Sequence, residues 1–107
     1  MNENIIYADS YDFDERIESG NVLVFFYNHF DTRSRAFEGI IEELADKYID
    51  TVSFVAVDTE QSPELAMRYE IDVLPGVVIF SKGEIIEQVE GSNSPEIYAD
   101  ILDSLGE

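Results

Sequence analysis

The chain contains no cysteine, and only 6 of its 107 residues are lysine or arginine. Without cysteine it can form no disulfide, no thiolate metal site and no thiol nucleophile, so redox chemistry that depends on sulfur is excluded. No apolar run approaches the roughly 18 to 20 residues that span a bilayer. The first residues, Met1 to Asn4, lack the basic and then apolar pattern of a signal peptide. We therefore expect a cytoplasmic protein.

The scarcity of basic residues leaves a formal net charge of −18, from 24 acidic and 6 basic side chains. Such a charge repels phosphate backbones and anionic lipids, so neither a nucleic acid nor a membrane is expected as a partner. The acidic residues are spread along the chain without an acidic tail. They could serve solubility or adaptation to a salty interior, or they could attract a basic partner.

Length and an apolar share of 45% fit one compact domain, which we expect to cover residues 1–107. Strands buried on both faces are predicted for the β-branched and aromatic runs at residues 22–27, 51–57 and 76–80. Peripheral strands are predicted at residues 5–7 and 84–90. The short connection between the last two strands predicts an antiparallel hairpin.

Helical patterns separate these strands. Apolar residues with helical spacing occur at Phe37, Ile40, Ile41, Leu44, Ala45 and Tyr48. Ser62 and Ser94 each precede a proline and an acid, which predicts a capping hydroxyl at the start of a helix. The last helix is expected to stop at Gly106, and an earlier one to run from about Tyr11 to Ser19 and end at Gly20. The order β-α-β-α-β-α-β-β-α predicts a three-layer α/β protein with a mixed sheet.

Three segments carry a specific sequence pattern. The strand at residues 22–27 runs into Phe30-Asp31-Thr32-Arg33-Ser34-Arg35 and then a long helix. Val73-Leu74-Pro75-Gly76 forms a turn before the next strand, and Phe80-Ser81-Lys82-Gly83-Glu84 forms a hairpin followed by Gly91. With these segments the chain resembles the thioredoxin family from about Ile5 to Leu105. The resemblance implies the thioredoxin fold, an α/β/α arrangement with about five strands and four helices.

The resemblance aligns Asp31 and Ser34 with the two cysteines of the family's Trp-Cys-Gly-Pro-Cys-Lys segment. Phe25 stands where the redox members keep a buried acid, and both the thiols and that acid serve dithiol chemistry. Gly39 replaces the proline that kinks the long helix, and Gly76 replaces the threonine after the cis-proline, which here would be Pro75. We interpret the chain as a natural non-redox, thioredoxin-like protein without a cofactor or dithiol-disulfide oxidoreductase activity.

Several roles remain open for the loop before the long helix. Asp31 either caps the helix N-terminus or keeps the negative charge of the family's thiolate. Ser34 would need a base to act as a nucleophile, and the only histidine, His29, lies five residues earlier. We expect His29 to be a surface residue, and a lone histidine does not make a metal site. Asp58 and Glu60 are interpreted as solvated loop acids.

The two arginines of this loop are notable because basic residues are so few. Arg33 and Arg35 could hold a phosphate or carboxylate at the helix N-terminus. Alternatively, they pair with Glu38, Glu42 or Asp31 across helical turns.

In the thioredoxin family, an extended client segment pairs with the backbone beside the cis-proline, as an added strand does. The equivalent surface would be Phe30, Asp31, Val73, Leu74, Pro75 and Gly91 to Asn93, unless Phe30 and Leu74 only pack on each other as a lid on the core. We therefore expect a non-redox protein that binds a protein or an extended peptide, and a basic partner is one option that the acidic surface leaves open. Its predicted binding residues are Phe30, Asp31, Thr32, Arg33, Ser34, Leu74, Pro75 and Gly91.

Two other functions remain as alternatives. One is an enzyme or anion-binding protein that uses the Asp31-Thr32-Arg33-Ser34-Arg35 helix N-terminus together with His29. The other is a structural subunit whose acidic surface docks on a basic partner.

Overall fold

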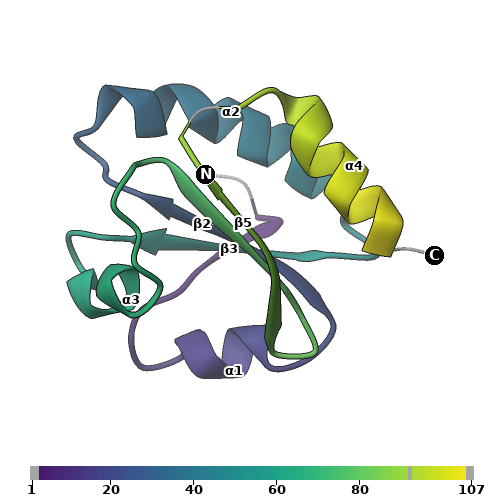
Figure 1. Cartoon of the computed structure of the whole chain (residues 1–107), viewed down its shortest axis with the longest axis horizontal. Coiled ribbons are helices and arrows are strands. Elements are labelled where there is room, and N and C mark those ends of the chain that lie inside the picture. Colours follow the sequence, from purple (N-terminus) through teal and green to yellow (C-terminus); the bar gives the residue numbers. More distant parts are fainter. Residues whose placement is uncertain (1–2, 92, 106–107) are drawn as a thin grey trace.

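A mixed five-stranded sheet lies at the centre of the computed structural model, which describes residues 3–91 and 93–105 (Figure 1). The strand order is β1-β3-β2-β4-β5. The strands are β1 (Ile5–Tyr7), β2 (Asn21–Tyr27), β3 (Ser53–Asp58), β4 (Gly76–Ser81) and β5 (Glu84–Glu90). β1, β3 and β2 are parallel, whereas β4 is antiparallel to both β2 and β5. The two strands predicted to be peripheral are the edges of the sheet.

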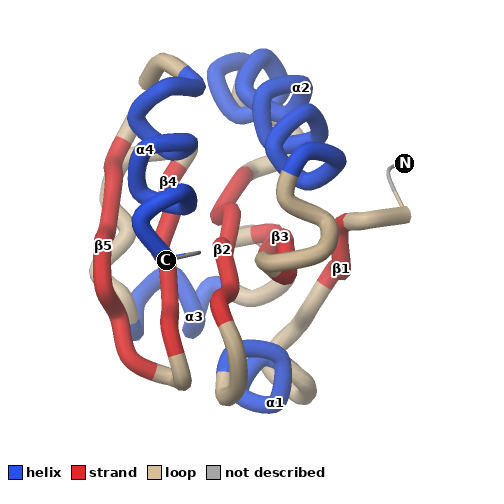
Figure 2. The backbone as a smooth tube through the Cα atoms, turned by 90° about the vertical axis from the view of Figure 1, so that its right-hand side faces the viewer, coloured by secondary structure: helices blue, strands red, loops and turns tan. Residues whose placement is uncertain are grey.

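Helices cover both faces of the sheet, as Figure 2 shows. They are α1 (Phe13–Ile17), α2 (Thr32–Lys47), α3 (Pro63–Arg68) and α4 (Pro95–Leu105). Successive side chains of a strand point to opposite faces, so Leu23 and Phe25 of β2 enter the core under α2 and α4. Val24 and Phe26 enter the second core, under α1 and α3. This is the three-layer α/β/α fold that the sequence predicts.

Some element ends differ from the sequence-based expectation. The first helix covers only Phe13–Ile17 rather than the predicted stretch from Tyr11 to Ser19. Its start is delayed because Asp9 Oδ1 accepts a hydrogen bond from Tyr11 N and Asp12 Oδ1 accepts one from Asp9 N, both at 2.9 Å. These bonds hold residues 9–12 in turns that compete with helix.

One of the predicted caps also needs correction. Ser62 occupies the N-cap position of α3, but its hydroxyl makes no capping hydrogen bond. The expected end of the last helix at Gly106 falls outside the described residues, whose last helical residue is Leu105. Among residues 3–91 and 93–105, no helix has the length and apolar character needed to cross a membrane.

Candidate functional site

Three loops meet at one end of the sheet because of the strand register. Gly76 at the start of β4 pairs with Phe26 near the end of β2 and with Glu90 at the end of β5. The segments after β2, before β4 and after β5 therefore lie next to one another. We call this end the three-loop surface; its residues are Phe30, Asp31, Val73, Leu74, Pro75, Gly91 and Asn93. Ser92, which belongs to the same predicted surface, lies outside the described residues.

The segment before β4 leaves backbone hydrogen-bonding groups unpaired at this surface. The Leu74–Pro75 peptide bond is cis. Pro75 is buried, and its carbonyl oxygen accepts a hydrogen bond of 2.8 Å from Gly91 N. Within the part of the chain that the structure describes, neither the N–H nor the C=O of Leu74 has a hydrogen-bond partner. Unpaired backbone groups of this kind are what an added strand uses.

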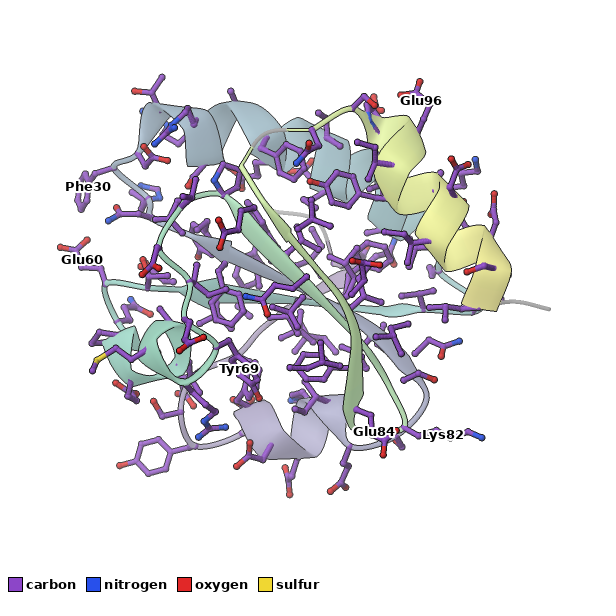
Figure 3. The ribbon with its side chains drawn as sticks, viewed as in Figure 1. Phe30, Glu60, Tyr69, Lys82, Glu84 and Glu96 are labelled. Carbon is purple, nitrogen blue, oxygen red and sulfur yellow. The ribbon has the colours of Figure 1, made fainter. Side chains whose placement is uncertain are left out.

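Phe30 is the largest apolar side chain on this surface that faces solvent. Its side chain is 77% exposed, and its ring lies nearly perpendicular to the His29 ring with the centroids 5.6 Å apart. Figure 3 shows Phe30 projecting outward from the loop before α2. Leu74, by contrast, packs against the core under α1 and α3. The interpretation of Phe30 as part of a lid on the core is therefore wrong.

Asp31 is the N-cap of α2. Its Oδ2 accepts hydrogen bonds from Ser34 N and from the Ser34 hydroxyl, both at 3.0 Å. The Ser34 hydroxyl also accepts a hydrogen bond of 3.3 Å from Asn28 N. These bonds fasten the end of β2 to the first turn of α2, and the capping role considered for Asp31 is confirmed.

The same geometry corrects two expectations for Ser34. The residue is only 1% exposed, so it cannot make a direct contact with a partner as a surface residue would. Its hydroxyl is held by Asp31 and not by His29, which is exposed. The histidine-activated nucleophile considered from the sequence is therefore not formed.

Arg33 and Arg35 are exposed, as is Thr32 between them and Asp31. The salt bridges of the described residues are Arg16–Asp12 at 3.4 Å and Arg68–Asp14 at 2.7 Å, so neither loop arginine has a carboxylate partner there. The expected pairing with Glu38, Glu42 or Asp31 is not present. An anion at this helix end would nevertheless meet the Asp31 carboxylate, which already accepts the N–H of Ser34.

The position that the resemblance aligns with the family's buried acid is occupied by an apolar ring. Phe25 is 4% exposed, stacks on Tyr27 at a centroid distance of 5.4 Å and contacts Phe37 at 6.0 Å. No proton-transfer group stands at this point of β2. In the described residues there is also no group of three or more histidine and carboxylate side chains suited to a metal ion.

Sequence reasoning missed a pocket of about 610 Å³ that adjoins the three-loop surface. α3, the segment before β4, and β5 form its walls, through Ala66, Met67, Glu70, Ile71, Asp72, Gln88 and Glu90. Met67 is 77% exposed at its rim. The sequence did offer one signal for this pocket, which is closeness to the predicted binding residues along the chain: Asp72 is two residues from Leu74, and Glu90 directly precedes Gly91.

Comparison with known proteins gives consistent matches over almost the whole chain. The family model described as Thioredoxin matches residues 4–104. Thioredoxin of Staphylococcus epidermidis is 31% identical over 99 residues, which are 92% of this chain and 95% of that protein. Thioredoxin of Staphylococcus aureus is 29% identical over the same shares. The solved N21Q mutant thioredoxin from Halobacterium salinarum NRC-1 has a TM-score of 0.87 at 24% identity, covering 96% of this chain and 91% of that chain.

Proposed function

The chain belongs to the thioredoxin family, and because it has no cysteine we propose that it is a non-redox member that binds a protein or extended peptide. The binding surface in this proposal is the three-loop surface. The loop before α2 has no thiol, whereas the cis-proline turn that would hold an extended segment is present.

The observation that carries the proposal is the unpaired backbone of Leu74. Its N–H and C=O lack partners among the described residues, directly before a cis peptide bond. Leu74 is half-buried, and both of its backbone groups are open to pair with the backbone of an extended strand. Two such hydrogen bonds, together with burial of the Phe30 ring, would form the centre of the interface.

The neighbouring pocket indicates the chemistry of the partner. Glu70, Asp72 and Glu90 bring carboxylates to its walls, and none of its lining residues is basic. A segment that crosses Leu74 and Gly91 would pass next to Asp72 and Glu90. A lysine or arginine in the bound segment would therefore meet a favourable field, and an acidic segment would be repelled.

The alternative function, anion-dependent chemistry at the α2 N-terminus, has weaker support. Arg33 and Arg35 are exposed and without salt bridges among the described residues, which favours it. However, Asp31 already occupies the capping position with its carboxylate, and Ser34 is buried. The first turn of α2 therefore stabilises its own anion, and we do not adopt this function.

A peptide-display selection followed by NMR would test the proposal. A random extended-peptide library is selected on the purified chain, and a selected peptide is titrated while the backbone amide resonances are followed. We expect saturable shifts at Leu74 and Gly91 and enrichment of lysine and arginine in the selected peptides. Peptides that shift only resonances far from the three-loop surface would contradict the proposal.

Two matched variants sharpen this test. Phe30→Ala removes an exposed ring from the surface, and Tyr11→Ala removes a still more exposed ring, 98% accessible, elsewhere. Because both rings face solvent, neither change should alter folding. We expect Phe30→Ala to weaken peptide binding about tenfold or more, the size typical of a central aromatic residue, and Tyr11→Ala to leave it unchanged. Equal effects of the two variants would contradict a role for Phe30.

A further inference from the structure

A second pocket opens on the β3 side of β2, beside the three-loop surface, which it meets through the contact of the His29 and Phe30 rings. It has a volume of about 460 Å³ and contains none of the residues that define the three-loop surface. Its principal residues are Tyr7, Tyr27, His29, Glu38 and Asp58. We call it the strand-end pocket. Its volume falls within the range of about 300–1,000 Å³ that is usual for small-ligand sites.

The position of the strand-end pocket follows from the chain path. Tyr7, Tyr27 and Asp58 are the last residues of the parallel strands β1, β2 and β3, and Tyr27 pairs with Asp58 in the sheet. β1 and β3 continue into α1 and α3, which pack on one face, whereas β2 continues into α2 on the opposite face. Figure 2 shows α1 and α2 on opposite sides of these strands. Ligands of open α/β sheets bind where neighbouring strands diverge in this way, beyond their carboxyl ends.

The pocket offers hydrogen-bond acceptors and negative charge. The hydroxyls of Tyr7 and Tyr27 make no hydrogen bond within the described residues, and neither does the Glu38 carboxylate. Asp58 uses Oδ1 to accept a hydrogen bond from Glu60 N, which orients its carboxylate. No lysine or arginine lines the pocket.

Glu38 acts on both tyrosines. Burial raises the pKa of Tyr27 to about 12, and the charges of Asp58, Tyr7 and Glu38 add to this shift. Burial also raises the pKa of Tyr7, with further contributions from Glu38 and Glu42. Both phenols therefore remain neutral around physiological pH in a field dominated by carboxylates, and that field favours a cation.

We propose that the strand-end pocket binds a primary ammonium or guanidinium group, with Glu38 and Asp58 as charged acceptors and the rings of Tyr7 and Tyr27 as its walls. Ammonium and guanidinium groups carry only hydrogen-bond donors, which matches a pocket with open acceptors. Their charge is also attracted by aromatic faces. The pocket shares no lining residue with the peptide-binding surface, but the two are neighbours, because the His29 ring of the pocket contacts the Phe30 ring of that surface.

The test is an amide NMR titration of the purified chain with n-butylammonium chloride, against sodium chloride at the same ionic strength. We expect saturable shifts at Tyr7, Tyr27 and Asp58 with n-butylammonium and none that saturate there with sodium. Equal responses to the two cations, or shifts spread evenly over the acidic surface, would overturn the proposal.

Charge-matched variants separate the pocket from the general field of the molecule. Glu38→Gln changes an exposed carboxylate of the pocket, and Glu84→Gln changes an exposed carboxylate in the hairpin at the opposite end of the sheet (Figure 3). Because a hydrogen bond to a charged group is lost, Glu38→Gln should weaken n-butylammonium binding about tenfold. Glu84→Gln should bind as the parent chain does. If both variants bind alike, the pocket has no specific role and the proposal fails.

The source of the cation is resolved by a parallel titration with the capped peptide acetyl-Gly-Lys-Gly-amide. Binding at least tenfold tighter than n-butylammonium, with the same dependence on Glu38, would support the proposal and assign the group to a protein side chain. Equal binding would support it and assign a free amine. No binding of either probe would overturn it.

Discussion

At the positions that the resemblance aligns with the family's two cysteines, Asp31 and Ser34 form a capping interaction. The Asp31 carboxylate accepts both the N–H and the hydroxyl of Ser34, which stabilises the first turn of α2. Phe25, which the resemblance aligns with the buried acid of the redox members, is a ring that stacks on Tyr27. The three residues therefore form a consistent set, because a buried carboxylate at position 25 would have no thiolate to serve.

Restoring the cysteines should not restore ordinary activity. The parent chain should reduce no insulin disulfide above a control without protein, since Asp31 and Ser34 cannot form a mixed disulfide. The double variant Asp31→Cys with Ser34→Cys should act at least about 100-fold more slowly than a redox-active thioredoxin, because no proton-transfer group stands at Phe25. The turbidity assay of insulin reduction measures both. Full activity of the double variant would show that Phe25 has no such effect.

Two glycines should respond oppositely to alanine. A Cβ on Gly76 would lie 2.9 Å from Ile71 Cγ2 and 3.4 Å from the Val73 carbonyl oxygen, whereas a Cβ on Gly39 would meet no atom within 4 Å. We expect Gly76→Ala to lower the free energy of unfolding by about 1–3 kcal/mol through overpacking. Gly39→Ala, inside α2, should raise it by about 0.5–1 kcal/mol. Urea unfolding measures both, and a stabilised Gly76→Ala variant would contradict the crowding.

At the scale of elements, α2 and α4 are joined by one side chain. Tyr48, which follows α2, donates its hydroxyl to Asp103 Oδ1 at 2.6 Å, and the Ala99 carbonyl oxygen lies 3.3 Å away. The pKa of Tyr48 is raised to about 12 by burial and by this hydrogen bond to Asp103. The phenol therefore remains a donor across the helix pair at any moderate pH.

Removing this donor should loosen the helix pair. Tyr48→Phe keeps the ring in the core but loses the hydrogen bond to a charged acceptor, so the free energy of unfolding should fall by about 1–2 kcal/mol. Tyr11→Phe, at a fully solvated position, is the control and should cause no change. Urea unfolding provides the values, and hydrogen exchange of α4 amides should quicken only in Tyr48→Phe. Unchanged stability would mean that water replaces the phenol without cost.

The elements show what the sequence could and could not predict. The apolar spacing of α2 predicted its core face, and residues such as Phe37, Ile41 and Leu44 are buried as expected. α1 was predicted too long because the hydrogen bonds of Asp9 and Asp12 to nearby backbone are not visible in an apolar pattern. Ser62 resembled a cap by its place before Pro63, yet side-chain rotamers decide whether a hydroxyl caps.

For the candidate site, too, some features could be predicted from the sequence and others could not. Sequence resemblance located the loop and the cis-proline turn, because both follow from short motifs. It could not separate Ser34, which is buried, from Arg33, which is exposed, since both lie in one turn of the same helix. The strand-end pocket was missed because Tyr7, Tyr27 and Asp58 are far apart in the sequence and only strand register brings them together.

At the scale of the whole molecule, alkaline pH should destabilise the fold. The pKa values of Tyr27 and Tyr48 are raised from 10.0 to about 12, so the folded state holds these protons more tightly than the unfolded chain does. Their contribution is fully present below pH 10 and is lost as the pH rises from 10 to 12. We expect the urea midpoint to fall over that window, and less steeply in Tyr48→Phe than in Tyr11→Phe. An identical pH dependence of the two variants would contradict the role of Tyr48.

The net charge of −18 should make the stability of the whole molecule depend on salt. Among the residues that the structure describes, the only salt bridges are Arg16–Asp12 and Arg68–Asp14. Most carboxylates therefore repel one another without a nearby basic side chain to compensate their charge. The screening length shortens from about 30 Å at 0.01 M salt to about 8 Å at 0.15 M and about 3 Å at 1 M, which weakens this repulsion.

We therefore expect the melting temperature to rise by about 5 °C or more between 0.01 M and 0.5 M sodium chloride, a shift that corresponds to roughly 1 kcal/mol in a domain of this size. Potassium chloride at the same ionic strength should give the same rise, because screening does not distinguish monovalent cations. A difference between the two salts would instead indicate a specific cation site. A flat or falling melting temperature would mean that the placement of the acidic side chains already keeps them far enough apart for their repulsion to cost the fold little.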